Sequence, residues 1–308
     1  MLKIPHIPVL LNEVIDSFKD IDEGYIVDCT VGYGGHSEAL LKQNDKIKLI
    51  CCDQDAQAIE FSKKRLQNFK DRVIFHNARF STVIKKYADF PIKGVLADIG
   101  VSSLQLDNKD RGFGFDSEKL DMRMDKNNSL SAFEVVNNYT KEELEELFRD
   151  YGEVRDFKRA AKLITEYREK KSIESAKELA EIFKRFPSKK GINPATLIFQ
   201  AVRIEVNDEL GELIELLDSI KDAKLKDCTV AVISFHSLED RIVKRVFKEW
   251  SKNCICPPGV MRCECGGNNS LGKIITKKPL TASKDEIKLN PRSRSAKLRV
   301  FKMAGQDE

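Results

Sequence analysis

The sequence lacks any apolar run that approaches the roughly 20 residues a helix needs to cross a bilayer. Segment 1–20 has neither a sufficient apolar core nor a small-residue cleavage site, so we expect no signal peptide. We therefore expect a cytoplasmic protein, a setting in which disulfide bonds are rare. The 308 residues are 41% hydrophobic and 33% charged, which is typical of a globular protein with more than one lobe.

The cysteines fall into two groups. The first lies in apolar, strand-like runs where buried free thiols are ordinary: Cys29, Cys51, Cys52 and Cys228. The second gathers in the loop CICPPGVMRCEC: Cys254, Cys256, Cys263 and Cys265. Its spacing is C-x-C, six residues, then C-x-C, whereas structural zinc sites usually have two to four residues between paired cysteines. Zinc binding there is left open, and we assign no metal to the mechanism.

The net charge of +4 conceals an uneven distribution. Residues 241–308 carry 16 Lys and Arg against 6 Asp and Glu, a net charge of +10, while the remainder of the chain is acidic. A basic segment suits a polyanionic partner, since phosphate contacts supply much of the affinity for nucleic acids. A solvated basic tail is the alternative explanation, and charge alone does not separate the two.

Strand and helix signals alternate along the first third of the chain. Short apolar runs at 25–30, 48–53, 72–77 and 93–100 predict buried strands, and helical spacing appears at 36–43 and 56–69. This alternation predicts an α/β fold with a parallel sheet and helices on both faces. Three later runs, 227–235, 272–278 and 296–303, are expected to complete the sheet.

A helical block interrupts this pattern. A polar, glycine-containing loop at 107–125 leads into helical patterns that continue to about 221. Pro194 is expected in the first turn of one helix, and Asn207 is the expected N-cap of the next. The helix at 237–250 is expected to be capped by Ser237.

A glycine cluster follows the first predicted strand. Counted from Gly32, the dinucleotide fingerprint G-x-G-x-x-G has Gly34 in place but Ser37 where the third glycine belongs. A ligand without a pyrophosphate needs that third glycine less strictly. Asp53 ends the second strand, where an acid can bind ribose hydroxyls, and Asp28 is placed to balance a positive charge. These features favour S-adenosylmethionine as the ligand, with the acid at the end of the fourth strand, Asp98, as a further polar contact.

Several blocks then resemble one enzyme family, in order: GYGGHSEALL, DIGVSSLQLD, RGFGF, LDMRMD, NPATLIFQAVRIEVNDEL, SFHSLEDRIVKR and NPRSRSAKLR. Together they closely resemble the bacterial 16S rRNA (cytosine(1402)-N(4))-methyltransferases, which act at the decoding centre of the small ribosomal subunit. The resemblance extends from His6 to about Arg299. It implies S-adenosylmethionine as methyl donor, and 16S rRNA, within the small subunit, as partner.

The resemblance also implies an architecture and a set of site residues. The expected fold is a Rossmann-like methyltransferase domain, 1–107 with 206–308, and an inserted loop plus helical substrate-recognition domain, 108–205. The family's cofactor contacts fall on Gly34, Gly35, His36, Asp53, Phe80, Asp98 and Gln105. Of these, His36, Phe80 and Gln105 come from the resemblance alone.

The mechanism is less determined than the cofactor. Many enzymes that methylate exocyclic amines have a proline-proline-aromatic motif after the fourth strand, but this chain has DIGVSS there. Asp98 is our first candidate for the group that accepts hydrogens from the substrate amine, with Asp121 and Asp125 as weaker candidates. Candidate RNA contacts are Arg111, Arg123, Arg241, Lys244, Arg292 and Arg294.

Other functions fit less well. The missing third glycine and the basic segment argue against a nucleotide-dependent oxidoreductase. His236 and Ser237 suggest a hydrolase, but the chain has no G-x-S-x-G elbow. A non-catalytic RNA-binding or assembly protein that keeps the fold is a third hypothesis, and the sequence leaves the oligomeric state undetermined.

Overall fold

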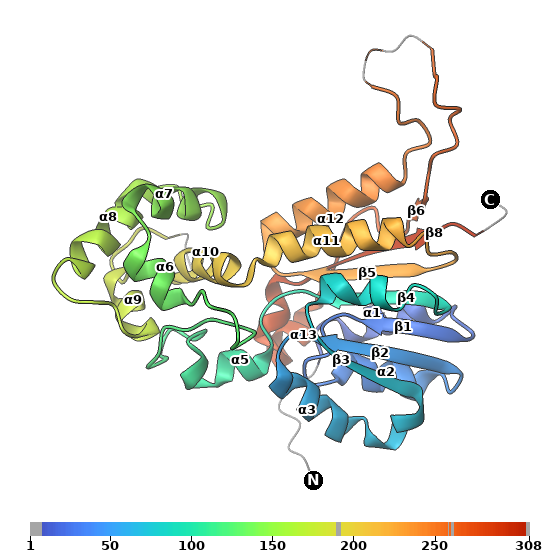
Figure 1. Ribbon diagram of the computed structural model, residues 1–308, viewed down its shortest axis with the longest axis horizontal. Helices are drawn as coiled ribbons and strands as arrows, with labels where there is room; N and C mark the ends of the chain where they lie inside the picture. Colours follow the sequence, from blue (N-terminus) through green and yellow to red (C-terminus); the bar gives the residue numbers. More distant parts are fainter. Residues whose placement is uncertain (1–7, 189–191, 258, 260–261, 306–308) are drawn as a thin grey trace. The chain divides into compact units, whose positions relative to one another are not determined.

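A computed structural model describes residues 8–188, 192–257, 259 and 262–305. The chain divides into two compact units (Figure 1). The α/β unit comprises Met1–Gly100 and Glu212–Glu308, and the helical unit comprises Val101–Gly211. The helical unit therefore begins seven residues before the expected start of the insertion and ends six residues after its expected end.

The α/β unit is built on one sheet. In the part of the chain that the structure describes, eight strands take the order β3-β2-β1-β4-β5-β8-β6, and β7 pairs with β8. Strands β1 to β5 pair in parallel, whereas β8 runs antiparallel to β5, β6 and β7. The strands are β1 Gly24–Asp28, β2 Ile47–Asp53, β3 Val73–Asn77, β4 Ile92–Asp98, β5 Thr229–Ser234, β6 Gly272–Ile274, β7 Leu280–Thr281 and β8 Lys297–Met303. This confirms the mostly parallel α/β sheet and the late strands that complete it.

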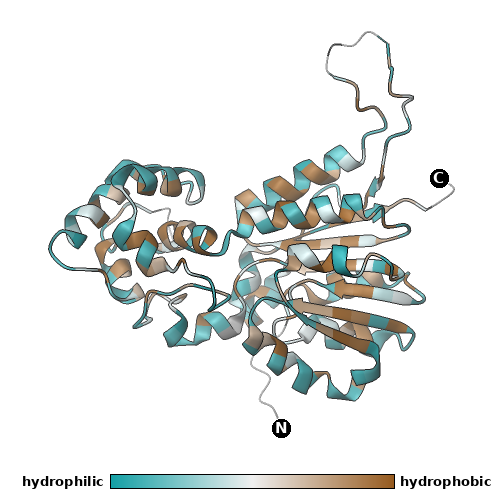
Figure 2. Cartoon of the chain, in the orientation of Figure 1, coloured by the Kyte–Doolittle hydropathy of each residue, from teal (hydrophilic) through white to brown (hydrophobic). Residues whose placement is uncertain are grey.

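Consecutive strand residues face opposite sides of the sheet, and both sides are covered. Ile26 and Leu49 lie in one apolar core with side chains of α1 Leu11–Phe18, α2 Gly35–Gln43 and α3 Ala56–Arg65. Their neighbours Val27 and Ile50 lie in another, with α4 Val83–Lys86, α11 Glu209–Asp222 and α12 Ser237–Trp250. Burial on both faces explains why the strands are continuous apolar runs, brown in Figure 2. Each fully buried aliphatic side chain stabilises the fold by about 1.5–3 kcal/mol.

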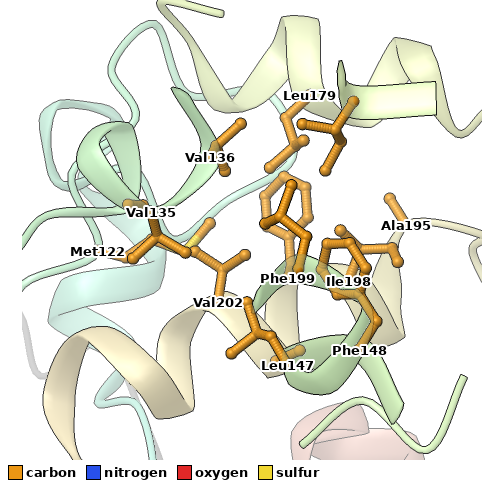
Figure 3. Close-up of a cluster of buried hydrophobic side chains, with 14 of the residues drawn as sticks. Met122, Val135, Val136, Leu147, Phe148, Leu179, Ala195, Ile198, Phe199 and Val202 are labelled. Atoms are coloured by element: carbon orange, nitrogen blue, oxygen red, sulfur yellow. The ribbon is translucent and has the colours of Figure 1, made fainter. Parts of the chain in front are cut away.

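The helical unit has its own apolar core, shown in Figure 3. Val202, Phe148 and Leu179 are buried in it, and Met122 joins them from the loop that precedes the helices. The helices are α5 Ser103–Asp107, α6 Ala132–Asn138, α7 Lys141–Asp150, α8 Phe157–Arg168, α9 Ala176–Ile182 and α10 Thr196–Asn207. Ser131, Thr140 and Ser175 begin α6, α7 and α9 with capping boxes, in which the side chain three residues on is a glutamate.

Three residues expected at helix starts have other positions, although the helix expected at 237–250 has the bounds observed for α12. Asn207 is the last residue of α10 rather than a cap, because its side chain donates to the Met122 carbonyl and accepts from the Met124 amide. Pro194 precedes the helix, whose N-cap is Ala195. His236, not Ser237, caps α12, since the first helical residue is Ser237 itself.

The sequence analysis did not predict four of the described helices, α1, α4, α5 and α13 Lys284–Leu289. The last is short, and none of its residues is buried. Within the ranges the structure covers, no helix is long and apolar enough to cross a membrane.

Candidate functional site

The candidate site lies where the strand order reverses. From β1 the chain proceeds outward to β2 and β3, and then returns to β4 and β5 on the other side. Ligands of open α/β sheets bind outside the carboxyl ends of the strands at such a switch point. Asp28 and Asp98 are the last residues of β1 and β4. Thr30 joins the two ends, because it donates its amide to Asp28 Oδ1 at 3.2 Å and accepts the Asp98 amide on Oγ1 at 2.8 Å.

The glycine turn connects β1 to α2. Gly32 and Gly34 have φ angles of +49° and +71°, a backbone conformation that residues other than glycine rarely adopt. Gly35 opens α2, and a Cβ placed on it would overlap Cγ of Pro8. The turn is therefore tightly packed on its own chain, and its glycines are required by backbone conformation and close approach.

Ser37 explains why the third glycine of the dinucleotide fingerprint is absent. Its side chain is fully buried, and its hydroxyl donates to Asp28 Oδ2 at 2.6 Å. Asp28 is itself only 2% exposed, and this burial raises the pKa of its carboxyl to about 6 despite the hydrogen bonds from Ser37 and Thr30. The position that would carry glycine instead holds an acid in place beneath the turn.

Asp53 is tied to the same turn from β2. Its Oδ2 accepts the Gly32 amide at 2.9 Å, and its Oδ1 accepts the Asp55 amide at 2.9 Å. Burial raises the pKa of the Asp53 carboxyl to about 7, against the lowering effect of both hydrogen bonds. The carboxyl group is thus fixed in orientation, with lone pairs left to accept hydrogen bonds from a ligand.

His36 and Asp98 face each other across the site. His36 Nε2 lies 2.9 Å from the Val9 carbonyl, so Nε2 carries the proton and Nδ1 is left to face Asp98 Oδ2 at 3.8 Å. Burial lowers the pKa of His36 to about 4, which keeps the imidazole neutral. Burial, followed by the charges of Asp28 and Glu239, raises the pKa of Asp98 to about 8. Asp98 Oδ1 is buried and has no hydrogen-bond partner among the described residues.

The remaining two predicted cofactor contacts lie in different units. Phe80 follows β3, in a short 3₁₀ turn at Phe80–Thr82, and packs partly buried against one core of the α/β unit. Gln105 lies in α5 of the helical unit, where its Oε1 accepts the Ser102 amide at 2.9 Å and its side chain is 3% exposed. Six of the seven predicted cofactor contacts thus belong to the α/β unit, namely Gly34, Gly35, His36, Asp53, Phe80 and Asp98.

One buried acid near Asp98 was missed by the sequence analysis. Glu239 is fully buried at the start of α12, where its Oε2 accepts the amides of Phe235 and His236 at 2.8 and 3.2 Å. His236 Nε2 lies 2.9 Å from its other oxygen. The sequence signal was the H-x-x-E spacing of a capping box, but a helix cap alone gives no indication of complete burial.

Two weaker catalytic candidates are held within the loop of the helical unit. Asp121 accepts from Arg123 Nε and Nη2 at 2.7 and 3.1 Å, and these bonds hold the pKa of its carboxyl below the usual range despite partial burial. Asp125 accepts both the backbone and the side-chain amide of Asn127. Both carboxylates are engaged in shaping the loop.

Arg111 was expected to contact RNA, but the structure buries its side chain. Its side chain is 1% exposed, and Nη2 donates to the carbonyls of Arg123 and Met124 at 2.9 and 3.0 Å. A guanidinium that is buried against the loop backbone cannot reach a phosphate without giving up these bonds. Arg123 is also committed to its own loop, donating to Asp121 and to the carbonyls of Lys126 and Asn128.

The other basic candidates lie in the α/β unit. Arg241 and Lys244 are exposed on α12, opposite the buried face formed by Val243 and Phe247. Arg294 is exposed, and Arg292 half-buried, in the 3₁₀ segment Pro291–Ser295.

The residues of the switch point fit S-adenosylmethionine. Asp98 Oδ1, which is buried and has no hydrogen-bond partner in the described ranges, can accept a hydrogen bond from an N–H group. Asp53 retains acceptor capacity for ribose hydroxyls, and the acids Asp28 and Asp98 suit a sulfonium cation. Three carboxyl groups at one edge of the sheet would repel the negative charge of a pyrophosphate, and this repulsion argues against a dinucleotide as the ligand.

Comparison with known proteins agrees with this geometry. Residues 3–304 match the model of the MraW methylase family. The chain is 62% identical over 301 residues to ribosomal RNA small subunit methyltransferase H of Aliarcobacter butzleri, covering 98% of this chain and 99% of the relative. Proteins of the same name are 58% identical over 302 residues in a Nitratiruptor species and 55% identical over 303 residues in Campylobacter jejuni. These matches cover 97% and 98% of this chain, and 99% and 97% of the relatives.

The family assignment agrees with the strand–glycine turn–helix arrangement and with the acids at the ends of β1, β2 and β4. The methyl donor predicted from the sequence, S-adenosylmethionine, is the cofactor of this class of methyltransferase. The chain belongs to the MraW methylase family, and it is an S-adenosylmethionine-dependent methyltransferase.

Proposed function

We propose that this enzyme methylates N4 of cytosine 1402 in 16S rRNA. The observation that carries the proposal is the 62% identity, over nearly its full length, to a relative named ribosomal RNA small subunit methyltransferase H. The choice of base and atom rests on the sequence blocks that resemble the cytosine-N4 enzymes, such as DIGVSSLQLD and SFHSLEDRIVKR. The partner is 16S rRNA within the small ribosomal subunit, in the cytoplasm.

The α/β unit supplies the donor site of this proposal. Gly34, Gly35 and His36 would contact the donor, Asp53 would accept hydrogen bonds from its ribose hydroxyls, and Phe80 would pack against its adenine. When bound, S-adenosylmethionine supplies an electrophilic methyl group. Gln105, from the helical unit, is a further proposed contact.

Asp98 is the proposed hydrogen acceptor for the substrate amine. The lone pair of cytosine N4 is delocalised into the ring, so the amine becomes nucleophilic only as it loses a proton. A carboxyl whose pKa is raised to about 8 is a stronger base than an exposed one once it is ionised, and no described residue is hydrogen-bonded to Asp98 Oδ1. The positive charge of the bound donor favours that ionised form. Asp121 and Asp125 are weaker proposals, because both already bind their own loop.

The helical unit is the proposed substrate-recognition domain, corresponding to the predicted insertion 108–205. Phe115 is 37% exposed and packs edge-on against Phe199, with the two ring centroids 4.7 Å apart. This packing leaves part of the Phe115 ring on which a base can stack. Lys244 and Arg294 are the proposed phosphate contacts of the α/β unit. The target base must leave its stack to reach the donor.

Methylation in vitro tests the proposal directly. Small subunits from a strain that lacks the modification are incubated with the enzyme and labelled donor, and the modified base is mapped by mass spectrometry of rRNA fragments. We expect a single N4-methylcytosine at position 1402. Label on another base, or on N4 of another cytosine, contradicts the proposed specificity, and the same assay on free 16S rRNA shows which form is the substrate.

A further inference from the structure

The loop between α12 and β6 contains four cysteines that the methyltransferase site does not use. Figure 1 shows this connection as a long excursion from the end of α12. Cys254, Cys256, Cys263 and Cys265 all carry free thiols, and their sulfur atoms lie within 4.8 Å of one another. We propose that these four sulfurs bind one Zn²⁺ ion, which folds the loop.

The distances between the sulfur atoms fit a single central ion. Zinc bound to thiolates has a Zn–S distance of about 2.3 Å, so the corners of its tetrahedron lie about 3.8 Å apart. Cys254 Sγ lies 3.7 Å from Cys263 Sγ and 3.8 Å from Cys265 Sγ, and the latter two are 3.6 Å apart. Disulfides would instead join the sulfurs in pairs at about 2.05 Å. Three nearly equal separations describe one face of a tetrahedron.

Backbone amides point at the same sulfurs. Cys256 Sγ accepts the Glu264 amide at 3.3 Å. Cys265 Sγ accepts the Ile255 amide at 3.4 Å and also the amide of Gly267, whose φ of +72° turns the chain back toward the cysteine. Such hydrogen bonds stabilise the negative charge of metal-bound thiolates and orient them. Each C-x-C pair thus donates one backbone amide to a sulfur of the other pair.

The loop has no apolar core to hold this arrangement. None of the described residues among 251–270 is buried, and Ile255 is 62% exposed. Among the described residues, backbone-to-backbone hydrogen bonds join the two strands of the loop at its base, where the Asn269 amide donates to the Asn253 carbonyl at 3.0 Å and the Leu271 amide to the Trp250 carbonyl at 2.7 Å. A segment without a core usually requires a metal or disulfides to adopt one conformation.

Binding exchanges four thiol protons, which pass to solvent, for one Zn²⁺ ion with four Zn–S bonds. The tetrahedral S₄ set selects zinc or iron among common metals, and it leaves no open position for a substrate or water. The site is therefore structural, and it orders the connection that leads into β6 at the edge of the sheet.

Metal analysis of the full-length enzyme tests the site. The protein is produced without a metal-binding tag, in zinc-supplemented medium, and purified with a phosphine reductant. We expect about one zinc per chain by elemental mass spectrometry, and a drop of about tenfold or more in the double variant Cys254→Ser with Cys265→Ser. The variant Cys228→Ala, which alters a buried thiol outside the loop, should retain the zinc.

Two readouts keep the test independent of activity. Cobalt substituted into the wild-type protein should give the visible bands of a tetrahedral ion and a sulfur-to-cobalt charge-transfer band. Limited proteolysis should cut within 254–265 much faster after zinc removal, while the remainder of the chain stays resistant. Zinc-free wild-type protein, iron in place of zinc, paired disulfides in place of metal, or full zinc content in the double variant would each overturn the assignment.

Discussion

Ser37 donates a 2.6 Å hydrogen bond to Asp28 Oδ2 in the interior of the α/β unit, at the position where a dinucleotide-binding fold would have glycine. The serine hydroxyl stabilises an acid at the switch point of the sheet. A glycine there would leave this oxygen of Asp28 without its donor, in a site where burial already disfavours the ionised form.

Replacing Ser37 by alanine should destabilise the enzyme in a pH-dependent way. The pKa of Asp28 is raised to about 6, so the carboxylate that benefits most from the hydroxyl is present mainly above that pH. We expect Ser37→Ala to lower the free energy of unfolding by about 1–2 kcal/mol at pH 8 and by less at pH 5.5, measured by urea denaturation. Ser62→Ala is the control, because this buried hydroxyl donates to the Ala58 carbonyl within its own helix. An equal loss for Ser37→Ala at both pH values would contradict this explanation.

Asp98→Asn should separate catalysis from cofactor binding. The amide keeps the shape of the side chain but cannot take up a proton, so we expect kcat on small subunits to fall by about 10²–10⁴-fold. Because Asp98 is also a proposed cofactor contact, the dissociation constant for S-adenosylmethionine, measured by calorimetry, should rise too, but by no more than about tenfold. Asp89→Asn, at an exposed position in the same unit, should leave both quantities unchanged. If Asp98→Asn weakens cofactor binding strongly but preserves kcat, then Asp98 holds the donor and another group accepts the hydrogens.

The cofactor-free enzyme should lose stability as the pH rises through neutrality. The carboxyl pKa values of Asp28, Asp53 and Asp98 are raised to about 6, 7 and 8, so the folded protein retains protons that the unfolded chain has lost. Neutral His36, with its pKa lowered to about 4, has the opposite effect, but only below its ordinary value of 6.5. Hydrogen bonds from the Ile255 and Gly267 amides lower the pKa of Cys265 to about 6, which also opposes the acids in this range, so the slope is measured in the Cys265→Ser background. Between pH 6.5 and 8 we expect the free energy of unfolding to fall by about 1 kcal/mol or more per pH unit.

Denaturation at fixed temperature in a series of buffers measures this slope. The Asp98→Asn variant should show a shallower decline than its Cys265→Ser parent, because it lacks the carboxyl with the highest pKa. S-adenosylmethionine at saturation should also flatten the decline, since its positive charge favours the ionised acids. A stability that is flat or rising from pH 6.5 to 8 would contradict the raised pKa values.

Arg111 and Arg294 should differ in what their loss impairs. Arg111→Ala removes a buried guanidinium that donates to two loop carbonyls, so we expect a loss of about 2 kcal/mol or more in stability. Exposed Arg294→Ala should leave thermal unfolding unchanged and raise KM for small subunits, more so at low salt. A higher KM for Arg111→Ala at unchanged stability would restore it as an RNA contact.

Local signals misled the sequence analysis chiefly at helix ends. Asn207 and Ser237 are both good N-cap residues in type, yet Asn207 ends a helix by binding the loop at Met122 and Met124, and His236 caps in place of Ser237. Propensity at a single position is weak, and a tertiary contact outweighs it. The prediction for Arg111 failed for a similar reason. Its charge predicted an exposed side chain, but the guanidinium is buried and donates to carbonyls of its own loop.

The sequence by itself determined the sheet, the cofactor and the family. Strands buried on both faces must be apolar throughout, and a tight turn before a helix must use glycine. Both features can therefore be predicted from the sequence. Only the tertiary structure decided how Asp28, Asp53 and Asp98 behave, because desolvation depends on every neighbour that folding brings to the switch point. The same holds for the cysteine loop, because its spacing in the chain left zinc binding open, whereas the sulfur separations of 3.6–3.8 Å support the proposed zinc site.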